Sequence, residues 1–182
     1  ADTVVITATF SQAMADSPVP QIVITGSGID SVAASDMTKT SSTVYTFSYN
    51  VPTGDGTGTI TLATGTDPSG NVVTAIPTSG ATFTVDNTTL TVNTFTLSDS
   101  SLLVGETATV TLVFSEQVTA FSSADDITVQ NGTLSAMTSS DNITWTGTFT
   151  PSTNIEDTSN ILSLANTYTD LAGNAGVTAQ TA

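Results

Sequence analysis

The residues of this chain that could do chemistry are its carboxylates. The 182 residues include sixteen Asp and Glu and a single Lys, with no His and no Cys, for a net charge of −15. Carboxylate and amide oxygens are hard ligands, and Ca²⁺ accepts about six to eight of them in loose geometry. The missing Cys and His exclude thiolate nucleophiles, disulfides, Cys-type zinc sites and the usual general base near neutral pH. Cation binding by oxygen is therefore the chemistry that the composition favours.

Catalysis is not expected from these residue types. A hydroxyl nucleophile needs a neighbouring base to activate it, and the chain offers no His and only Lys39. Asp125 and Asp126 could in principle act as an acid/base pair, but adjacent residues of a strand point to opposite faces. We therefore predict that the chain is not an enzyme.

The net charge also limits the partners. Nucleic-acid binding requires a basic surface that displaces counterions from the phosphates, and this chain repels phosphates. The same sign of charge opposes binding to anionic membranes. No apolar run approaches the length of about 18 residues expected of a membrane span. We expect no nucleic-acid partner and no direct membrane contact.

The sequence contains an internal repeat. Residues 2–12 align with residues 106–116, and residues 66–71 align with residues 169–174. Between them, Tyr45 and Tyr49 match Trp145 and Phe149. These matches keep their order at offsets of about 100 residues, which indicates two copies of one unit.

Each copy alternates apolar and hydroxyl residues. Val4, Ile6, Ala8 and Phe10 share one face of their segment, and residues 108–114 repeat the pattern. Such alternation predicts half-buried strands, and turn clusters separate about seven of them in each copy. The predicted fold class is all-β, with two tandem immunoglobulin-like antiparallel β-sandwich domains at residues 1–86 and 87–182.

The alignment places the start of the chain at the second strand of copy one. Copy two has a first strand, residues 90–97, ahead of the strand that matches residues 2–12. We therefore expect the first strand of the first domain to be missing from the chain. We also expect the natural protein to extend in both directions, as a slice of a longer array.

The seven-strand topology gathers acidic residues of copy two at one pole. Glu116 follows the second strand, and the loop after the sixth strand carries Asp170 and Asn174. The linker with Asp86 reaches the same pole, and Asp126 opens another strand there. We predict that these five residues bind Ca²⁺ at the interdomain junction.

The matching pole of copy one offers Asp2 and Asp67, together with Gln12 and Asn71. Because Gln12 replaces the Glu of copy two, we expect a weaker calcium site here. Asp and Asn are also frequent turn formers, since they hydrogen-bond their own backbone. That interpretation remains open for each of these residues.

Four segments resemble bacterial immunoglobulin-like repeats: residues 83–88, 114–116, 126–132 and 168–174. The resemblance covers nearly the whole chain and is looser in copy one, where Gln12 and residues 18–20 depart from the pattern. Such repeats build the extender regions of large bacterial surface adhesins, including the calcium-dependent RTX type. The resemblance implies that Ca²⁺ at the junctions stiffens the array.

By the same resemblance, the chain is extracellular, at the bacterial cell surface, and its partners are neighbouring repeats of the same chain. A distal domain elsewhere in the parent protein would bind the host or surface ligand. Two other functions remain open: a module that binds a glycan or host protein with the loops of one pole, and an accessory domain of a secreted hydrolase. An aromatic cluster in the loops would favour the binding module, and the sequence shows none.

Overall fold

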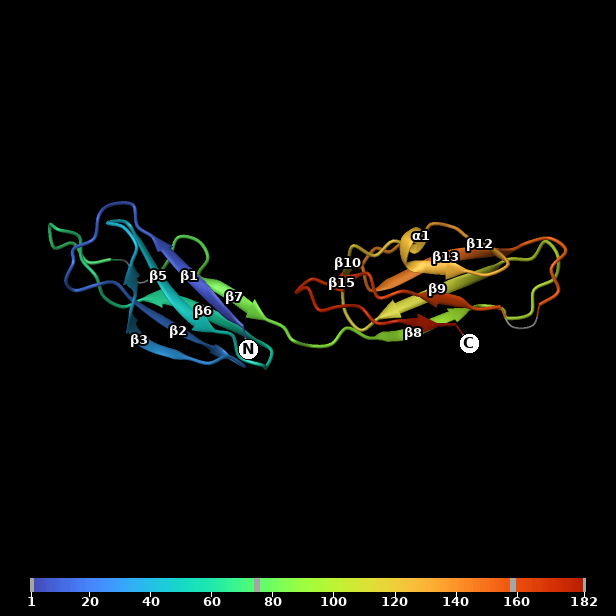
Figure 1. Ribbon diagram of the computed structural model, residues 1–182, viewed down its shortest axis with the longest axis horizontal. Helices are drawn as coiled ribbons and strands as arrows, with labels where there is room; N and C mark the ends of the chain where they lie inside the picture. Colours follow the sequence, from blue (N-terminus) through green and yellow to red (C-terminus); the bar gives the residue numbers. More distant parts are fainter. Residues whose placement is uncertain (1, 74–75, 158–159, 182) are drawn as a thin grey trace. The chain divides into compact units, whose positions relative to one another are not determined.

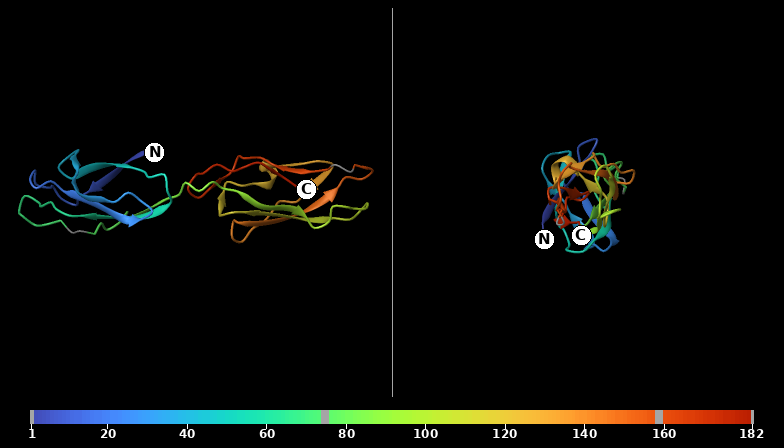
Figure 2. Two further views of the ribbon diagram at one scale, coloured as in Figure 1. Left: turned by 90° about the horizontal axis from the view of Figure 1, so that it is seen from below. Right: turned by 90° about the vertical axis from the view of Figure 1, so that its right-hand side faces the viewer.

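The computed structural model describes residues 2–73, 76–157 and 160–181. The chain divides into two compact units, Ala1–Asn87 and Thr88–Ala182 (Figure 1). Within each unit the strands are arranged in layers (Figure 2). The described residues are almost entirely strand and loop, with antiparallel pairing throughout. The all-β prediction is confirmed.

The second unit has the strand order of an immunoglobulin-like sandwich. Its four-stranded sheet has the order β12-β13-β9-β8, a second sheet has the order β11-β14-β16, and β10 pairs with β15. In chain order this corresponds to the two sheets of seven-stranded immunoglobulin-like domains. The strands are β8 (Val92–Leu97), β9 (Ala108–Phe114), β10 (Val118–Thr119), β11 (Ile127–Val129), β12 (Gly132–Leu134), β13 (Thr144–Pro151), β14 (Leu162–Leu164), β15 (Thr169–Asp170) and β16 (Ala179–Gln180).

The alternation in the sequence builds the core of this unit. In β9, Ala108, Val110, Leu112 and Phe114 are buried, while Thr109 between them is exposed. The buried side chains pack between the sheets with residues such as Tyr168. Removing a Val, Leu or Phe side chain from water contributes about 1.5–3 kcal/mol. The period of two therefore decides which face of β9 becomes core.

The first unit has a related arrangement. One sheet has the order β1-β5-β4, and the other has the order β3-β2-β6-β7. β1 pairs with β5 as β9 pairs with β13, in agreement with the alignment of the repeats. Among the described residues, no strand takes the place beside β1 that β8 takes beside β9. The strands are β1 (Thr3–Thr9), β2 (Gln21–Ser27), β3 (Val32–Asp36), β4 (Thr38–Lys39), β5 (Val44–Asn50), β6 (Gly56–Leu62) and β7 (Thr82–Val85).

The core of the first unit is smaller. Its buried side chains include Ile22, Ile24, Tyr45 and Tyr49. The core-facing residues of β1 are only partly covered, in contrast to the buried residues of β9. Its second sheet carries β3 as an additional edge strand beside β2.

One short helix departs from the sequence-based expectation. Asp125 and Asp126 are not neighbours on a strand but lie in α1 (Ser123–Asp126). The backbone N–H groups of both residues donate to the carbonyl of Ser122. A helix of one turn is too short to show an apolar stripe, so periodicity could not reveal it. Within the described ranges, no helix has the length and apolar character needed to cross a membrane.

Candidate metal centre

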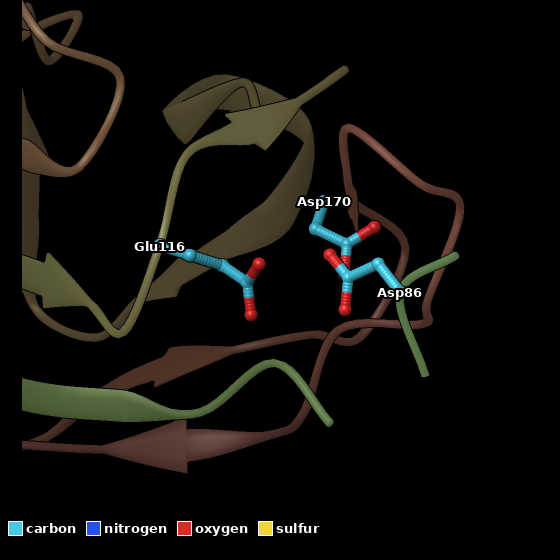
Figure 3. A group of neighbouring side chains, drawn as sticks. All are labelled: Asp86, Glu116 and Asp170. Carbon is cyan, nitrogen blue, oxygen red and sulfur yellow. The ribbon is translucent and has the colours of Figure 1, made fainter. Parts of the chain in front are cut away.

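Three carboxylates converge in the structure. Asp86, Glu116 and Asp170 each offer an oxygen, and these three oxygens lie within 4.8 Å of one another. Figure 3 shows the side chains directed toward a common point. This is the one group of at least three possible metal ligands among the residues that the structure describes.

Asp170 is the buried member of the group. It ends β15, and its side chain is 2% exposed. Its Oδ1 accepts hydrogen bonds from the backbone N–H groups of Ala172, Gly173 and Asn174 at 2.7–2.9 Å. Its Oδ2 accepts one from the side-chain amide of Asn174 at 2.8 Å. One turn thus holds the carboxylate in a fixed orientation.

The surroundings of Asp170 favour its charged form. Burial by itself opposes ionisation, but the hydrogen bonds from Asn174, Gly173 and Ala172 together outweigh it, so the pKa of Asp170 is lowered from 3.8. A carboxylate that stays ionised close to two other acids is suited to hold a cation.

Glu116 and Asp86 come from the ends of two strands. Glu116 lies in the short segment between β9 and β10, and Asp86 directly follows β7. Both side chains are half-buried. The segment around Glu116 is fixed by a backbone hydrogen bond of 2.9 Å from Ser115 to Thr91. The end of β9 and this hydrogen bond therefore position Glu116 within the second unit.

The spacing of the oxygens is compatible with calcium. Ligand oxygens lie about 2.3–2.6 Å from a bound Ca²⁺, so two oxygens of one ion are separated by up to about 5 Å. The observed 4.8 Å limit falls inside that range. The chain has only one basic side chain, Lys39, and this residue forms an ion pair with Asp16 in the first unit. A solvent cation could therefore balance the three acids.

Two other predicted ligands of copy two, Asn174 and Asp126, are not members of the three-carboxylate group. Asn174 lies next to Asp170, where its side-chain amide and backbone N–H hold that carboxylate. Asp126 does not belong to the three-carboxylate group. Its Oδ2 accepts a hydrogen bond from the backbone of Ser122, and its Oδ1 accepts one from the Thr167 hydroxyl. The prediction of Asp126 at this centre is therefore corrected: it is buried, and its carboxylate joins its own loop to the segment that contains Thr167.

The first unit repeats the Asp170 turn but not the acidic group. Asp67 Oδ1 accepts hydrogen bonds from the backbone of Ser69 and Asn71, both at 2.9 Å. Its Oδ2 accepts bonds from the side-chain amides of Asn71 at 2.7 Å and Gln12 at 2.8 Å. These bonds, that from the Asn71 side chain first, lower the pKa of Asp67. Hydrogen-bond donors thus surround this carboxylate.

The expected grouping of Asp2 with Asp67 is wrong. Asp2 precedes β1, whereas Gln12, which contacts Asp67, lies beyond its other end. The seven residues of β1 span roughly 23 Å at about 3.3 Å per residue. The two ends of one strand lie at opposite poles, so Asp2 and Asp67 cannot share an ion.

The turn-forming interpretation that the sequence left open describes Asp67 and Asp170, but the sequence analysis did not identify the geometry of the turn. Asp67 and Asp170 share the pattern Asp-x-x-Gly-Asn, in which Gly70 and Gly173 have φ of 88° and 98°. This left-handed conformation favours glycine, and here it accompanies a turn whose N–H groups point at the Asp oxygen. The shared Gly-Asn pair was the signal that could have identified this geometry.

The strand order defines the second unit as an immunoglobulin-like β-sandwich. Residues 86–182, more than half of the chain, match the family described as the bacterial Ig-like domain, and the chain belongs to this family. It is a non-catalytic fold family. The match begins at Asp86, so it contains all three members of the acidic group. No curated protein and no solved structure matches the chain.

Proposed function

We propose that this chain is a structural extender of an extracellular bacterial adhesin, and that Ca²⁺ bound by Asp86, Glu116 and Asp170 stiffens it. The observation that carries the proposal is the approach of three carboxylate oxygens to within 4.8 Å in a chain with one basic residue. Membership of the bacterial Ig-like family supports a structural surface module. Neighbouring repeats of the same chain would be its partners, and a distal domain would bind the host or surface ligand.

The ion would act by restricting backbone motion. Asp86 belongs to the segment that leads from β7 toward β8, while Glu116 and Asp170 are held by the loops of the second unit. One Ca²⁺ that binds all three would hold these side chains together. Backbone carbonyls or waters would supply the rest of the about six to eight oxygens that the ion accepts. The spacer would therefore be stiff in calcium and more mobile without it.

The remaining acidic surface fits the same function. A net charge of −15 keeps neighbouring chains apart and opposes non-specific adhesion along the spacer. At the millimolar Ca²⁺ of extracellular fluids, an ion that binds only the folded state also adds to stability. At a concentration of about 100 times its Kd, this addition is about 2.7 kcal/mol.

The test is thermal unfolding in excess EDTA and in millimolar Ca²⁺, with small-angle scattering on both samples. The expected results are a higher Tm and a longer, stiffer particle in calcium. Glu116→Gln should remove both responses, because it replaces a charged ligand by an amide of the same shape. Glu156→Gln removes an exposed acid outside the group and should keep them. An unchanged Tm and particle length in calcium would refute the proposal.

A further inference from the structure

The connection between β11 and β12 in the second unit carries an asparagine directly before a glycine. Asn131–Gly132 is the single Asn-Gly pair in the sequence. Because glycine has no side chain, its backbone nitrogen can approach the side-chain carbonyl carbon of the preceding asparagine. This approach begins the spontaneous loss of the side-chain amide. The pair is therefore a candidate for modification without an enzyme.

The backbone at this connection restricts both positions of the pair. Asn131 has φ of 49°, a left-handed conformation that Gly, Asn and Asp adopt most readily. At Gly132, an added Cβ would lie 2.4 Å from the Phe149 ring and 2.7 Å from the Thr150 carbonyl oxygen. A residue with a side chain therefore does not fit at position 132 unless its neighbours move. The fold thus keeps a reactive pair where most less reactive pairs would be strained.

Hydrogen bonds restrain the reacting groups in the folded unit. The side-chain nitrogen of Asn131 donates to Asn160 Oδ1 at 2.6 Å and to Asp157 Oδ2 at 3.1 Å. Asn160 in turn donates to the Asp157 carbonyl at 2.8 Å. The Asn131 carbonyl accepts from Ser152 N–H at 2.8 Å, which fixes the peptide group that would have to rotate. All three side chains are exposed, so water competes for these bonds and local opening frees the amide.

We propose that Asn131 is a self-modification site that loses its amide through a cyclic imide, and that Asp157 and Asn160 set the rate. When their hydrogen bonds open, the Gly132 nitrogen loses its proton to hydroxide and attacks Asn131 Cγ. The bond from Cγ to Nδ2 breaks, and ammonia leaves with a proton from water. Water then opens the imide at one of its two carbonyl carbons. The product is aspartate, or isoaspartate in which the chain runs through Cβ and Cγ, and water is the only co-reactant.

Both products would disturb the second unit. Position 131 connects β11 and β12, which belong to different sheets. Isoaspartate lengthens the backbone of this connection by one carbon atom. In the aspartate product, a carboxylate replaces the amide that now donates to Asp157, and two like charges at hydrogen-bond distance repel each other. Modification should therefore add a negative charge and lower the stability of this unit.

The experiment incubates the full 182-residue chain at mildly alkaline pH and maps aspartate and isoaspartate by peptide mass spectrometry. Asn131 should react before Asn142, which is also exposed and left-handed but precedes Ile143. Unfolding in urea should raise the rate at Asn131 about ten-fold or more, because both hydrogen bonds of its amide are lost. A rate at Asn131 no higher than that at Asn142, or one that urea leaves unchanged, would overturn the proposal.

Variants of the two restraining residues test their control of the rate. Asn160→Ala removes one acceptor and should raise the rate at Asn131 about five-fold, and Asp157→Ala should raise it similarly. Glu156→Ala removes an exposed acid two to four residues away from them in no described contact with Asn131 and should keep the original rate. Circular dichroism selects the variants that remain folded, and the urea comparison needs no variant. Rates unchanged in folded Asn160→Ala and Asp157→Ala would overturn the proposal.

A pair of variants at position 131 tests the effect of the product. Asn131→Asp is the aspartate product itself, and Asn131→Gly also permits φ of 49° but adds no charge. Both lose the donor to Asp157, so only the first brings two carboxylates together. The Tm of Asn131→Asp should therefore rise with added salt more than that of Asn131→Gly, since salt screens exposed charges. An equal response of both variants to salt would refute the predicted repulsion.

Discussion

The side-chain amide of Gln12 donates a hydrogen bond to the carboxylate of Asp67 over 2.8 Å. In the second unit the corresponding residues are Glu116 and Asp170, which offer two carboxylate oxygens within 4.8 Å. The same backbone position thus holds a neutral donor in one copy and a second acid in the other. A donor stabilises the ionised Asp directly, while an acid requires a cation for the same effect.

This difference predicts that a second acid at position 12 would make the Tm of the first unit depend on calcium. Gln12→Glu should lower the Tm by several degrees in EDTA, because two carboxylates would replace an amide–carboxylate hydrogen bond. Millimolar Ca²⁺ should recover part of that loss. Gln12→Ala, which removes the hydrogen bond without adding charge, should cost less in EDTA and should gain nothing extra from calcium. Calorimetry of the three proteins gives the comparison, and equal effects of both substitutions in EDTA would contradict the argument.

Acid should destabilise the second unit through Asp170. Its folded pKa lies below 3.8, the ordinary value that it takes in the unfolded chain. The stability that its ionised form contributes is therefore fully present above about pH 4 and is lost as the pH falls through the lower folded pKa. Urea unfolding in EDTA at pH 6, 4 and 3 should show this loss, and Asp170→Asn should show a smaller one between pH 4 and 3. If the difference in free energy of unfolding between the unchanged chain and Asp170→Asn stays the same at every pH, the titration of Asp170 does not cause the loss.

The fold was predictable because burial follows a period of two. The alternation at residues 108–114 became β9 with its apolar face buried, and the repeat alignment identified β1 as its equivalent. The helix α1 could not be predicted, since its four residues depend on local hydrogen bonds to Ser122. Local contacts of this kind leave no periodic signal in the sequence.

The acidic group was predictable in part because strand direction decides which loops meet. Glu116 and Asp170 follow strands that end at the same pole, and the structure brings both together with Asp86. The prediction for Asp2 was wrong because Asp2 and Gln12 lie at opposite ends of β1. Asp126 was misplaced because side-chain hydrogen bonds to Ser122 and Thr167 depend on tertiary packing. Calcium binding by the group remains a prediction.

A buried hydroxyl provides a separate stability test. Tyr45 is fully buried, and its hydroxyl has no hydrogen-bond partner among the described residues. Tyr45→Phe removes a polar atom whose burial is uncompensated, so the free energy of unfolding should stay unchanged or rise by up to about 1 kcal/mol. Tyr49→Phe is the matched control in the same unit, because that hydroxyl donates to the Asp30 carbonyl at 3.0 Å. It should lower the free energy of unfolding by about 0.5–1.5 kcal/mol in urea titrations.

A glycine with a left-handed backbone, Gly173, shapes the Asp170 turn. Gly173 has φ of 98°, and its N–H donates to Asp170 Oδ1 at 2.7 Å. A Cβ at this position would meet no atom within 4 Å, so the cost of Gly173→Ala comes from the backbone conformation alone. We expect a loss of about 1–2 kcal/mol in EDTA from that strain.

The same substitution in the first unit separates strain from ion binding. Gly70→Ala imposes the same conformation, at φ of 88° and with no neighbour within 4 Å, and should cost a similar amount in EDTA. Only Gly173→Ala should also weaken Ca²⁺ binding in calorimetric titration, because the N–H groups that orient the Asp170 carboxylate would move. Gly54→Ala, at a position without a positive φ and with its nearest atom at 3.7 Å, should leave both properties unchanged. Equal calcium affinity in the Gly173→Ala and Gly70→Ala proteins would show that the turn does not orient a ligand of the ion.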